Sequence, residues 1–549
     1  MERLVAMISN RVGWAAVVFG SLFATAAVAY HPGFVEYTTS SDQLTIPSIW
    51  WDVVEGSWTH LGGWQFSRAP YLFPDLLIYG AAKAILGDIR LAIFAACMLM
   101  LLASVVISGL ILNRLSGVQP SQGALATLTV LVTLTCAALL GEWADPDSRA
   151  FFRLSMYNYE FCSHYTAFVM ALLCAVLAHD YCRDRGVGQI LALAVLIMLM
   201  TVSNFIFVLY FVVPMTIVLA AAVLLRPDLR APALHLIAIH LLALALGMAL
   251  MAQINRQPLP TYKMHVDNVT NGLTALLHLM PPGDPIVFAV FWLPLTVLGV
   301  YGAWALRHRH KASGRTGIAG FLVLAVLANL AFAALYIARE DDVLLRYLAM
   351  TTTAPLLIVA LGLVRACGAR AGHWLALAAT VLPAAMYGAG AASSGNLVPT
   401  LVRWSPSEAE DLAGCVARYQ LKAGLAGYYL ARRLMAASGW AVQINQLEPD
   451  RPVLYYWGNN RNWFAHDTRH PERAPEYNFV ITNRVDYTRT GSFRFVHRDA
   501  YDEDAVVQAF GPPDAWVTCG ALRVALFTAS DGIDRAVADL MARTASPIP

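Results

Sequence analysis

The sequence predicts a polytopic α-helical membrane protein that carries a small α/β domain at its C-terminus. The first observation is composition: of 549 residues, 58% are hydrophobic and only 13% are charged, whereas a soluble protein carries roughly 25% charged residues. The second is a series of apolar runs long enough to cross a bilayer. The third is a change near residue 392, after which charged residues become frequent and no run of spanning length remains.

Eleven apolar runs are expected to form transmembrane helices. We divide the long run 187–225 at Thr201–Asn204, because polar residues there predict a tight turn. The first run is interpreted as an uncleaved span, since it is long for the apolar part of a signal peptide, although Ala27–Ala29 would serve as a cleavage site. The runs are 11–30, 90–112, 123–141, 165–180, 187–203, 205–225, 232–252, 285–306, 317–338, 344–366 and 373–391.

The charges of the connecting segments predict the orientation. With a cytoplasmic N-terminus, the short basic connections all lie inside, as the positive-inside rule requires. An odd number of spans then places the C-terminal domain on the periplasmic face of a bacterial inner membrane. The basic residues are Arg114, Arg183, Arg185, Arg226, Arg230, Arg307, Arg309, Lys311, Arg315, Arg365 and Arg370.

Two domains follow from this division: a transmembrane domain, 1–391, with a long first periplasmic loop, 31–89, and a periplasmic α/β domain, 392–549. Within the second domain, Leu421–Ala437 has an apolar helical face and predicts a helix. Three short runs bounded by turn residues predict strands. These runs are 451–457, 477–482 and 522–528.

The cysteines give no evidence for a metal centre. None of the eight forms a CxxC pair or lies at zinc-finger spacing from a histidine. Cys415 and Cys519 are the two in the C-terminal domain. In an oxidising compartment they would form a disulfide between its start and its end, and two separate buried thiols are the open alternative. Walker and Rossmann glycine motifs are absent from the sequence as well.

The first outer loop gathers an unusual number of titratable groups and tryptophans. A belt of tryptophans at the membrane surface explains part of the aromatic content, but it does not explain the charges. The residues are Glu36, Asp42, Asp52, Glu55, His60, Arg68 and Asp75, with Trp50, Trp51, Trp58 and Trp64 between them.

The segment Ser67–Asp88 of this loop predicts a turn followed by an amphipathic helix in the membrane interface. Arg68 stands where this helix begins. Its planar, permanently charged guanidinium suits a phosphate group at the level of the lipid headgroups. The alternative is an arginine that anchors the loop to lipid without binding a substrate.

This layout resembles the GT-C superfamily, the polytopic glycosyltransferases that use polyprenyl-phosphate sugar donors, and within it the protein mannosyltransferase and aminoarabinose transferase group. The resemblance rests on an acidic residue early in the loop, Asp42, followed by Arg68-Ala-Pro70-Tyr71 and an apolar helix ending at Gly87. A second similarity lies in the Arg346-Tyr347 pair at the outer entry to the tenth predicted span. The family usually has an acidic pair where this chain has Asp42-Gln43, and a double proline where it has one.

The resemblance implies a GT-C-like arrangement of the helices and a sugar transfer at the outer interface. Arg68 and Arg346, with Tyr347, would neutralise the departing phosphate. Asp42, or in second place Asp52, would deprotonate or orient the acceptor hydroxyl. Further candidates for substrate binding are Trp51, Tyr71, Tyr159, Glu160, Lys263 and Arg339.

A divalent cation, Mg or Mn, is left open. Glu340, Asp341 and Asp342 form an acidic triplet whose oxygens suit such an ion. A solvated loop explains the triplet equally well.

Three other functions compete with glycosyl transfer to a glycan, lipid or protein acceptor. A transporter or flippase for lipid-linked saccharides would need polar residues within the spans, of which the sequence has few. A ligase or polymerase of lipid-linked saccharides would use similar chemistry. A membrane scaffold would bind glycan without catalysis. For the stretch Tyr455–Trp463 we consider acceptor binding, and favour a purely structural strand and turn. Nothing in the sequence suggests a nucleic-acid partner.

Overall fold

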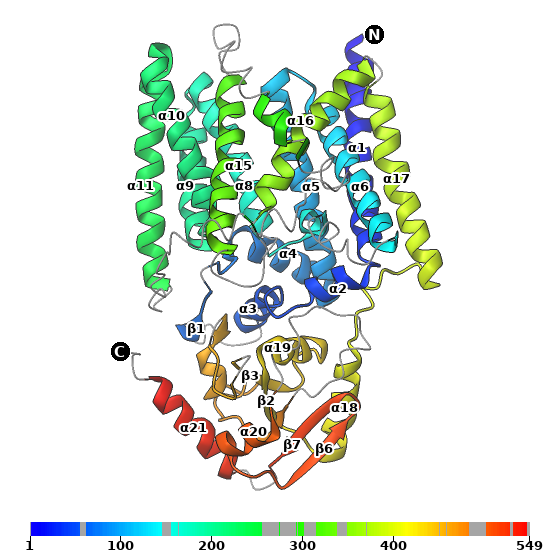
Figure 1. Cartoon of the computed structure of the whole chain (residues 1–549), viewed down its shortest axis with the longest axis vertical. Coiled ribbons are helices and arrows are strands. Elements are labelled where there is room, and N and C mark those ends of the chain that lie inside the picture. The colour runs from blue at the N-terminus through cyan, green and yellow to red at the C-terminus, as the bar shows by residue number, and fades with distance from the viewer. Residues whose placement is uncertain are drawn as a thin grey trace.

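The computed structural model describes most of the chain, and all structural statements concern this part. It comprises residues 2–54, 62–67, 69–144, 155–162, 164–254, 274, 292–293, 295–300, 315–337, 348–368, 371–448, 451–456, 458–482, 501–527 and 531–545. A bundle of long helices occupies one end of the molecule, and a domain with a β-sheet occupies the other (Figure 1). The short helices of the first loop lie between them.

Helices occupy ten of the eleven predicted apolar runs. Seven are long and apolar enough to cross a membrane, and those at 187–203, 317–332 and 353–367 are apolar but shorter. The run 285–306 lies largely outside the described residues, so eleven spans are not confirmed. The helices are α1 Glu2–Val28, α5 Ile89–Ser116, α6 Pro120–Ala144, α8 His164–Asp184, α9 Val187–Ser203, α10 Val213–Leu225 after the π-helix η5 Val208–Val212, α11 Arg230–Ile254, α15 Arg315–Ile337, α16 Ala349–Cys367 and α17 Ala371–Ser394.

The division of the long run 187–225 is confirmed. Helix α9 ends at Ser203, and Asn204 leaves the helical conformation with φ −154°.

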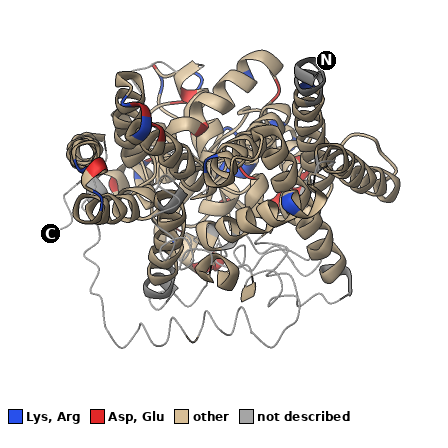
Figure 2. Cartoon of the chain, turned by 90° about the horizontal axis from the view of Figure 1, so that it is seen from above, with Lys and Arg blue, Asp and Glu red and all other residues tan. Residues whose placement is uncertain are grey.

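Charged residues are few along the helices of the bundle, as Figure 2 shows from the end that carries the N-terminus. Arg114 and Asp180 form a salt bridge of 2.6 Å near the ends of α5 and α8. The bundle therefore keeps its few charges away from the middle of the helices.

Small residues let the bundle helices approach closely. A Cβ added at Gly20 of α1 would lie 2.2 Å from the carbonyl oxygen of Ala379 in α17, and one at Gly109 of α5 would lie 2.3 Å from that of Pro120 in α6. Because lipid is as apolar as a leucine side chain, helices in a membrane associate through such tight packing.

The C-terminal domain contains a five-stranded mixed sheet with the strand order β3-β2-β5-β7-β6. Strand β2 is parallel to β3 and β5, whereas β7 is antiparallel to β5 and β6. The strands are β2 Ala423–Gly427, β3 Gln443–Leu447, β5 Tyr477–Ile481, β6 Ala515–Cys519 and β7 Leu522–Leu526, and the helices are α18 Ser407–Tyr419, α19 Tyr428–Ala437, α20 Glu503–Phe510 and α21 Asp531–Ala545.

The predicted strands at 477–482 and 522–528 are confirmed, but two other predictions need correction. The first half of the predicted helix 421–437 is strand β2, and only its second half, α19, is helical. The pairing of β2 with β3 and β5 makes this half a strand, and Gly424 suits it, because a Cβ there would lie 2.2 Å from the ring of Phe479 in β5. The predicted strand 451–457 forms only an isolated bridge between Leu454 and Leu447.

A disulfide joins Cys415 of α18 to Cys519 at the end of β6, with a Cα–Cα distance of 5.9 Å. It resolves the alternative that the sequence left open. The cross-link ties the first helix of the domain to an edge strand of its sheet.

The first loop forms short elements beneath the bundle. They are α2 Pro32–Thr38, α3 Thr45–Val54, β1 Trp64–Gln65, the π-helix η2 Leu72–Leu76 and α4 Leu77–Leu86. The predicted helix after Pro70 is therefore present as η2 and α4, and it ends at Gly87, whose φ is +71°. The peptide bond between Phe73 and Pro74 is cis.

Replacing Gly20 with Val tests the packing of α1 on α17. The branched side chain collides with the α17 backbone, and we expect a loss of roughly 1–3 kcal/mol in stability, typical of an overpacked core. Thermal unfolding of the purified protein in detergent measures it. Gly388→Val is the matched control on α17, since a Cβ there meets nothing within 4 Å. Equal melting temperatures for the two variants would contradict the close contact.

Candidate functional site

Asp52 joins the first loop to the C-terminal domain. Its carboxylate is 2% exposed and accepts hydrogen bonds from Trp64 Nε1 at 2.6 Å, Asn460 Nδ2 at 2.6 Å and Trp463 Nε1 at 3.0 Å. Beside it, β1 pairs antiparallel with β4 Asn459–Asn460. One buried carboxylate thus connects two parts of the chain some 400 residues apart, since Asp52 and Asn460 are separated by 408 positions.

Tryptophans from both sides surround this carboxylate. Trp51 stacks on Trp440, with ring centroids 5.2 Å apart, and meets Trp463 edge-on. Trp64 also meets the edge of Trp463, at 5.4 Å. Trp51 and Trp64 therefore pack against the C-terminal domain, and the membrane belt does not account for them. The stretch Tyr455–Trp463 contributes to the same interface, which agrees with the structural interpretation that we favoured for it.

Arg432 of α19 makes the second connection between domain and loop. Its side chain is 2% exposed, and it donates to Ser41 O and Thr45 Oγ1, both at 2.7 Å, and to Gly458 O. The carboxylate of Asp42 lies near enough to favour the arginine's charge. A buried guanidinium needs such acceptors, because removing it from water is costly. Arg432 therefore fixes the turn between α2 and α3.

Asp42 stands in that turn, at the junction of loop and domain. Tyr428, at the start of α19, donates its hydroxyl to Asp42 Oδ1 at 2.5 Å, and its carbonyl oxygen accepts from Ser41 Oγ at 2.6 Å. Burial raises the pKa of Tyr428, and the nearby Asp42 raises it further. The phenol therefore stays protonated and keeps its role as the donor that orients the carboxylate.

A second buried carboxylate, Asp75 of η2, lies on the bundle side of the same region. Asp75 Oδ1 accepts from the backbone N–H of Cys162 at 2.5 Å and from Thr166 Oγ1 of α8 at 2.8 Å. Burial raises the pKa of Asp75 to about 7, and these hydrogen bonds oppose the rise. Cys162 Sγ in turn approaches Asp42 O at 3.8 Å. These contacts, from Asp42 through Cys162 to Asp75, link the turn between α2 and α3 to the helical bundle.

Ser203, the last residue of α9, holds the segment that follows Arg68. Ser203 O accepts from Tyr71 N at 3.0 Å, while Ser203 Oγ accepts from Phe73 N and donates to Phe73 O. Tyr71 has a left-handed backbone, φ +54°, and its ring lies 5.9 Å from that of His164. The turn predicted at 201–204 therefore has a role in positioning the first loop.

The structure places six of the predicted site residues. Asp42 precedes α3 and Asp52 lies within it, and each is hydrogen-bonded to the C-terminal domain. Trp51 is next to Asp52 in α3 and stacks on Trp440, whereas the ring of Tyr71 lies near that of His164. Tyr159 is fully buried and hydrogen-bonds Thr135 Oγ1 at 3.0 Å, and Glu160 is also fully buried. The others lie outside the described residues and stay predictions: Arg68, Lys263, Arg339, Glu340, Asp341, Asp342, Arg346 and Tyr347. Among the residues that are described, no three His, Cys, Asp or Glu side chains form a metal-binding group.

Sequence reasoning missed Tyr428 and Arg432 as site residues, although a signal for them was present. Arg432 follows Tyr428 by four positions, so both lie on one face of the helix, together with Met435. A charged residue on an apolar helical face needs buried partners. Asp75 was noted as a charge of the loop, but nothing local indicated that its partners come from the start of α8.

Comparison with known proteins adds no assignment. No family model matches the chain, and no curated protein is detectably similar to it in sequence.

Replacing Asp52 with Ala tests the junction. The change leaves Trp64, Trp463 and Asn460 as buried donors without their acceptor, so we expect a loss of roughly 3 kcal/mol or more in stability. Thermal unfolding measures the loss, with Asp539→Ala on the exposed face of α21 as the control. A variant that unfolds like the control would contradict this role of Asp52 in the junction.

The raised pKa of Asp75 predicts a pH dependence of stability. Its carboxyl stays protonated in the folded protein up to a pH of about 7, but ionises near 3.8 when unfolded. Its contribution to stability therefore falls as the pH rises from about 4 to 7 and levels off above that range. Asp75→Asn keeps an acceptor for Cys162 and Thr166 but cannot ionise. Melting temperatures from pH 4 to 8 should diverge between the two proteins, and parallel profiles would contradict the prediction.

Proposed function

We propose that this protein is a membrane glycosyltransferase that moves a sugar from a polyprenyl-phosphate donor to an acceptor at the outer face of the inner membrane. The observation that carries the proposal is the position of Asp42. Its carboxylate lies at the junction of the helical bundle and the C-terminal domain, oriented by the Tyr428 hydroxyl at 2.5 Å. A donor whose tail lies in lipid and whose phosphate lies at the interface would present its sugar at this level.

The reaction needs one proton transfer and one departing anion. The acceptor hydroxyl attacks the anomeric carbon, the bond from that carbon to the phosphate oxygen breaks, and the phosphate leaves with the electron pair. Asp42 accepts the hydroxyl proton as the general base. Arg68 and Arg346, with Tyr347, stabilise the charge that develops on the phosphate.

Asp42 is preferred over Asp52 because of what surrounds each carboxylate. Asp52 is buried and already accepts three hydrogen bonds from indole and amide groups. Binding a substrate hydroxyl there would require breaking the junction between loop and domain. Asp42 is half-buried and lies in the turn that follows α2. A substrate hydroxyl can therefore reach its carboxylate without breaking the junction between loop and domain.

Two further observations support an enzyme at the outer face. A disulfide such as Cys415–Cys519 is typical of oxidising compartments, which favours a periplasmic C-terminal domain. In the described apolar helices, the buried polar residues are hydroxyls, amides and histidines, with no buried Asp, Glu, Lys or Arg. A transporter or flippase usually places ionisable groups within its spans, so this pattern favours transfer over transport.

Asp42→Asn tests the proposal in a transfer assay with purified protein in lipid and a panel of radiolabelled polyprenyl-phosphate sugars. We expect transfer to fall by roughly 100-fold or more, because general base catalysis contributes about that much. Arg68→Ala should also abolish transfer. Tyr428→Phe, which removes only the orienting hydroxyl, should show a smaller loss of about tenfold.

Asp504→Asn, on the exposed face of α20, is the matched control and should keep full activity. Each variant is first checked by thermal unfolding, so that a loss of transfer is not a loss of fold. If no donor in the panel is consumed, or if Asp42→Asn and Arg68→Ala match the wild type, the transport or scaffold functions become the better account.

A further inference from the structure

A cavity of about 510 Å³ lies where the first loop, the start of α5 and the C-terminal domain meet. Trp50 and Trp51 of α3 and Lys83 of α4 line it from the loop, and Trp440, Thr468 and Arg469 line it from the domain. Asp42 and Tyr428 do not line it. It is therefore a site separate from the one proposed for transfer.

Tryptophans form one wall of this cavity. Trp51 and Trp440 stack with an interplanar angle of 26°, and each is 8% exposed. The ring of Trp50 packs directly on Gly80 of α4, where an added Cβ would be 2.3 Å from the ring. Rigid aromatic surfaces with a few polar groups are typical of ligand sites, and the C–H face of a sugar ring packs well on an indole.

Two cations stand at the cavity without a carboxylate to neutralise them. Lys83 Nζ donates to Gly87 O, and Arg469 Nε donates to Trp440 O at 3.0 Å, both of which are neutral acceptors. Within the described residues, neither side chain has an acidic group within salt-bridge distance. Among the described lining residues, Lys83 and Arg469 are therefore cations without a carboxylate partner.

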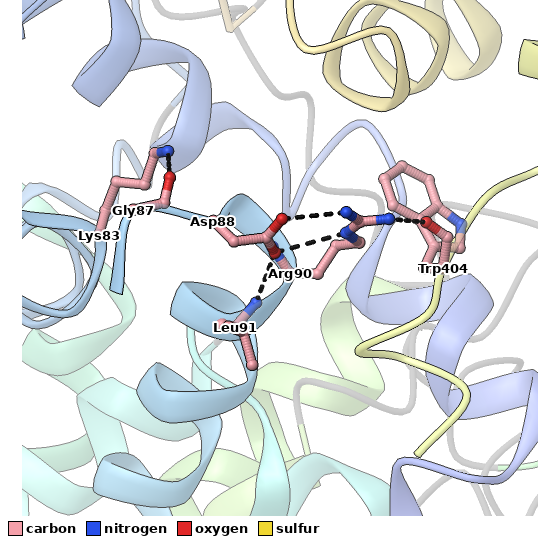
Figure 3. A network of polar contacts seen from close by, with 6 residues as sticks. All are labelled: Lys83, Gly87, Asp88, Arg90, Leu91 and Trp404. Carbon is pink, nitrogen blue, oxygen red and sulfur yellow. Dashed lines mark hydrogen bonds and ion pairs between the residues drawn. The ribbon is translucent and has the colours of Figure 1, made fainter. Parts of the chain in front are cut away.

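The carboxylate that borders the cavity is already engaged. Asp88 accepts from the backbone N–H groups of Arg90 and Leu91 at the start of α5 and forms a salt bridge of 3.0 Å with the Arg90 side chain (Figure 3). Arg90 also donates to Trp404 O at 3.3 Å, which ties this corner to the segment before α18. Figure 3 shows that Lys83 lies apart from this pair, bonded only to Gly87 among the residues drawn.

We propose that this cavity binds an anionic saccharide, with the sugar ring against the tryptophans and its phosphate or carboxylate between Lys83 and Arg469. Charge-assisted hydrogen bonds from two cations favour an anion over a neutral sugar. The cavity adjoins α5, which is long and apolar enough to cross a membrane. A soluble sugar phosphate and a sugar phosphate carried on a lipid would therefore present the same groups to the cavity. Binding of either does not depend on the proposed glycosyl transfer.

Calorimetric titration of the full-length protein tests this directly, with glucose 6-phosphate as the soluble probe and glucose and inorganic phosphate as comparisons. A second arm uses phosphatidylcholine nanodiscs with and without dodecyl glucoside 6-phosphate. We expect the sugar phosphate to bind at least roughly tenfold more tightly than glucose, and Lys83→Gln and Arg469→Gln each to weaken it by roughly tenfold. Binding in one arm or in both supports the proposal and identifies the source of the ligand.

Arg473→Gln is the matched control, because this exposed cation lies on the same segment but does not line the cavity. It should bind as the wild type does. Lys83 and Arg469 are half-buried and exposed, respectively, so their variants should fold, and thermal unfolding checks this. The proposal is overturned if neither probe binds, if the two cavity variants bind like the control, or if phosphate or glucose alone binds as tightly as the sugar phosphate.

Discussion

The burial of two charged side chains, Asp52 and Arg432, is the constraint on which the rest of this structure depends. One belongs to the first loop and one to the C-terminal domain, and each makes two hydrogen bonds across the junction. An isolated buried charge costs several kcal/mol, so neither residue is tolerable unless the two parts are docked. Burying these groups therefore fixes the geometry between the helical bundle and the C-terminal domain.

This constraint reaches the candidate site directly. The turn that carries Asp42 is bonded through Ser41 to Arg432 and Tyr428, and through Cys162 to the bundle. The carboxylate is thus positioned by elements from three distant parts of the sequence. A reacting group held this way keeps its orientation because several independent contacts fix it. The C-terminal domain is therefore part of the candidate site, since it supplies the Tyr428 and Arg432 contacts.

The same docking creates the neighbouring cavity. Trp51 lies at both the docked junction and the cavity. Its ring stacks on Trp440 in the cavity wall, and the adjacent Asp52 accepts a hydrogen bond from Trp463 of the C-terminal domain. A ligand in the cavity would contact loop and domain at once, and would therefore stabilise their association. If a saccharide binds there and transfer occurs at Asp42, the two would be linked through the C-terminal domain, whose Tyr428 contacts Asp42 and whose Trp440 lines the cavity.

The sequence by itself determined the membrane class, the positions of most helices, the turn at 201–204 and the strands at 477–482 and 522–528, because hydrophobic periodicity and run length are local properties of the chain. It also pointed to Asp42 and to the crowded first loop. It did not determine that Ala423–Gly427 is a strand, since that conformation depends on pairing with β3 and β5, which lie elsewhere in the sequence. Nor did it reveal that Asp52 is a docking residue, that Tyr428 orients Asp42, or that Lys83 and Arg469 share a cavity. Those pairings join residues hundreds of positions apart, and only the tertiary packing that buries their charges brings them together.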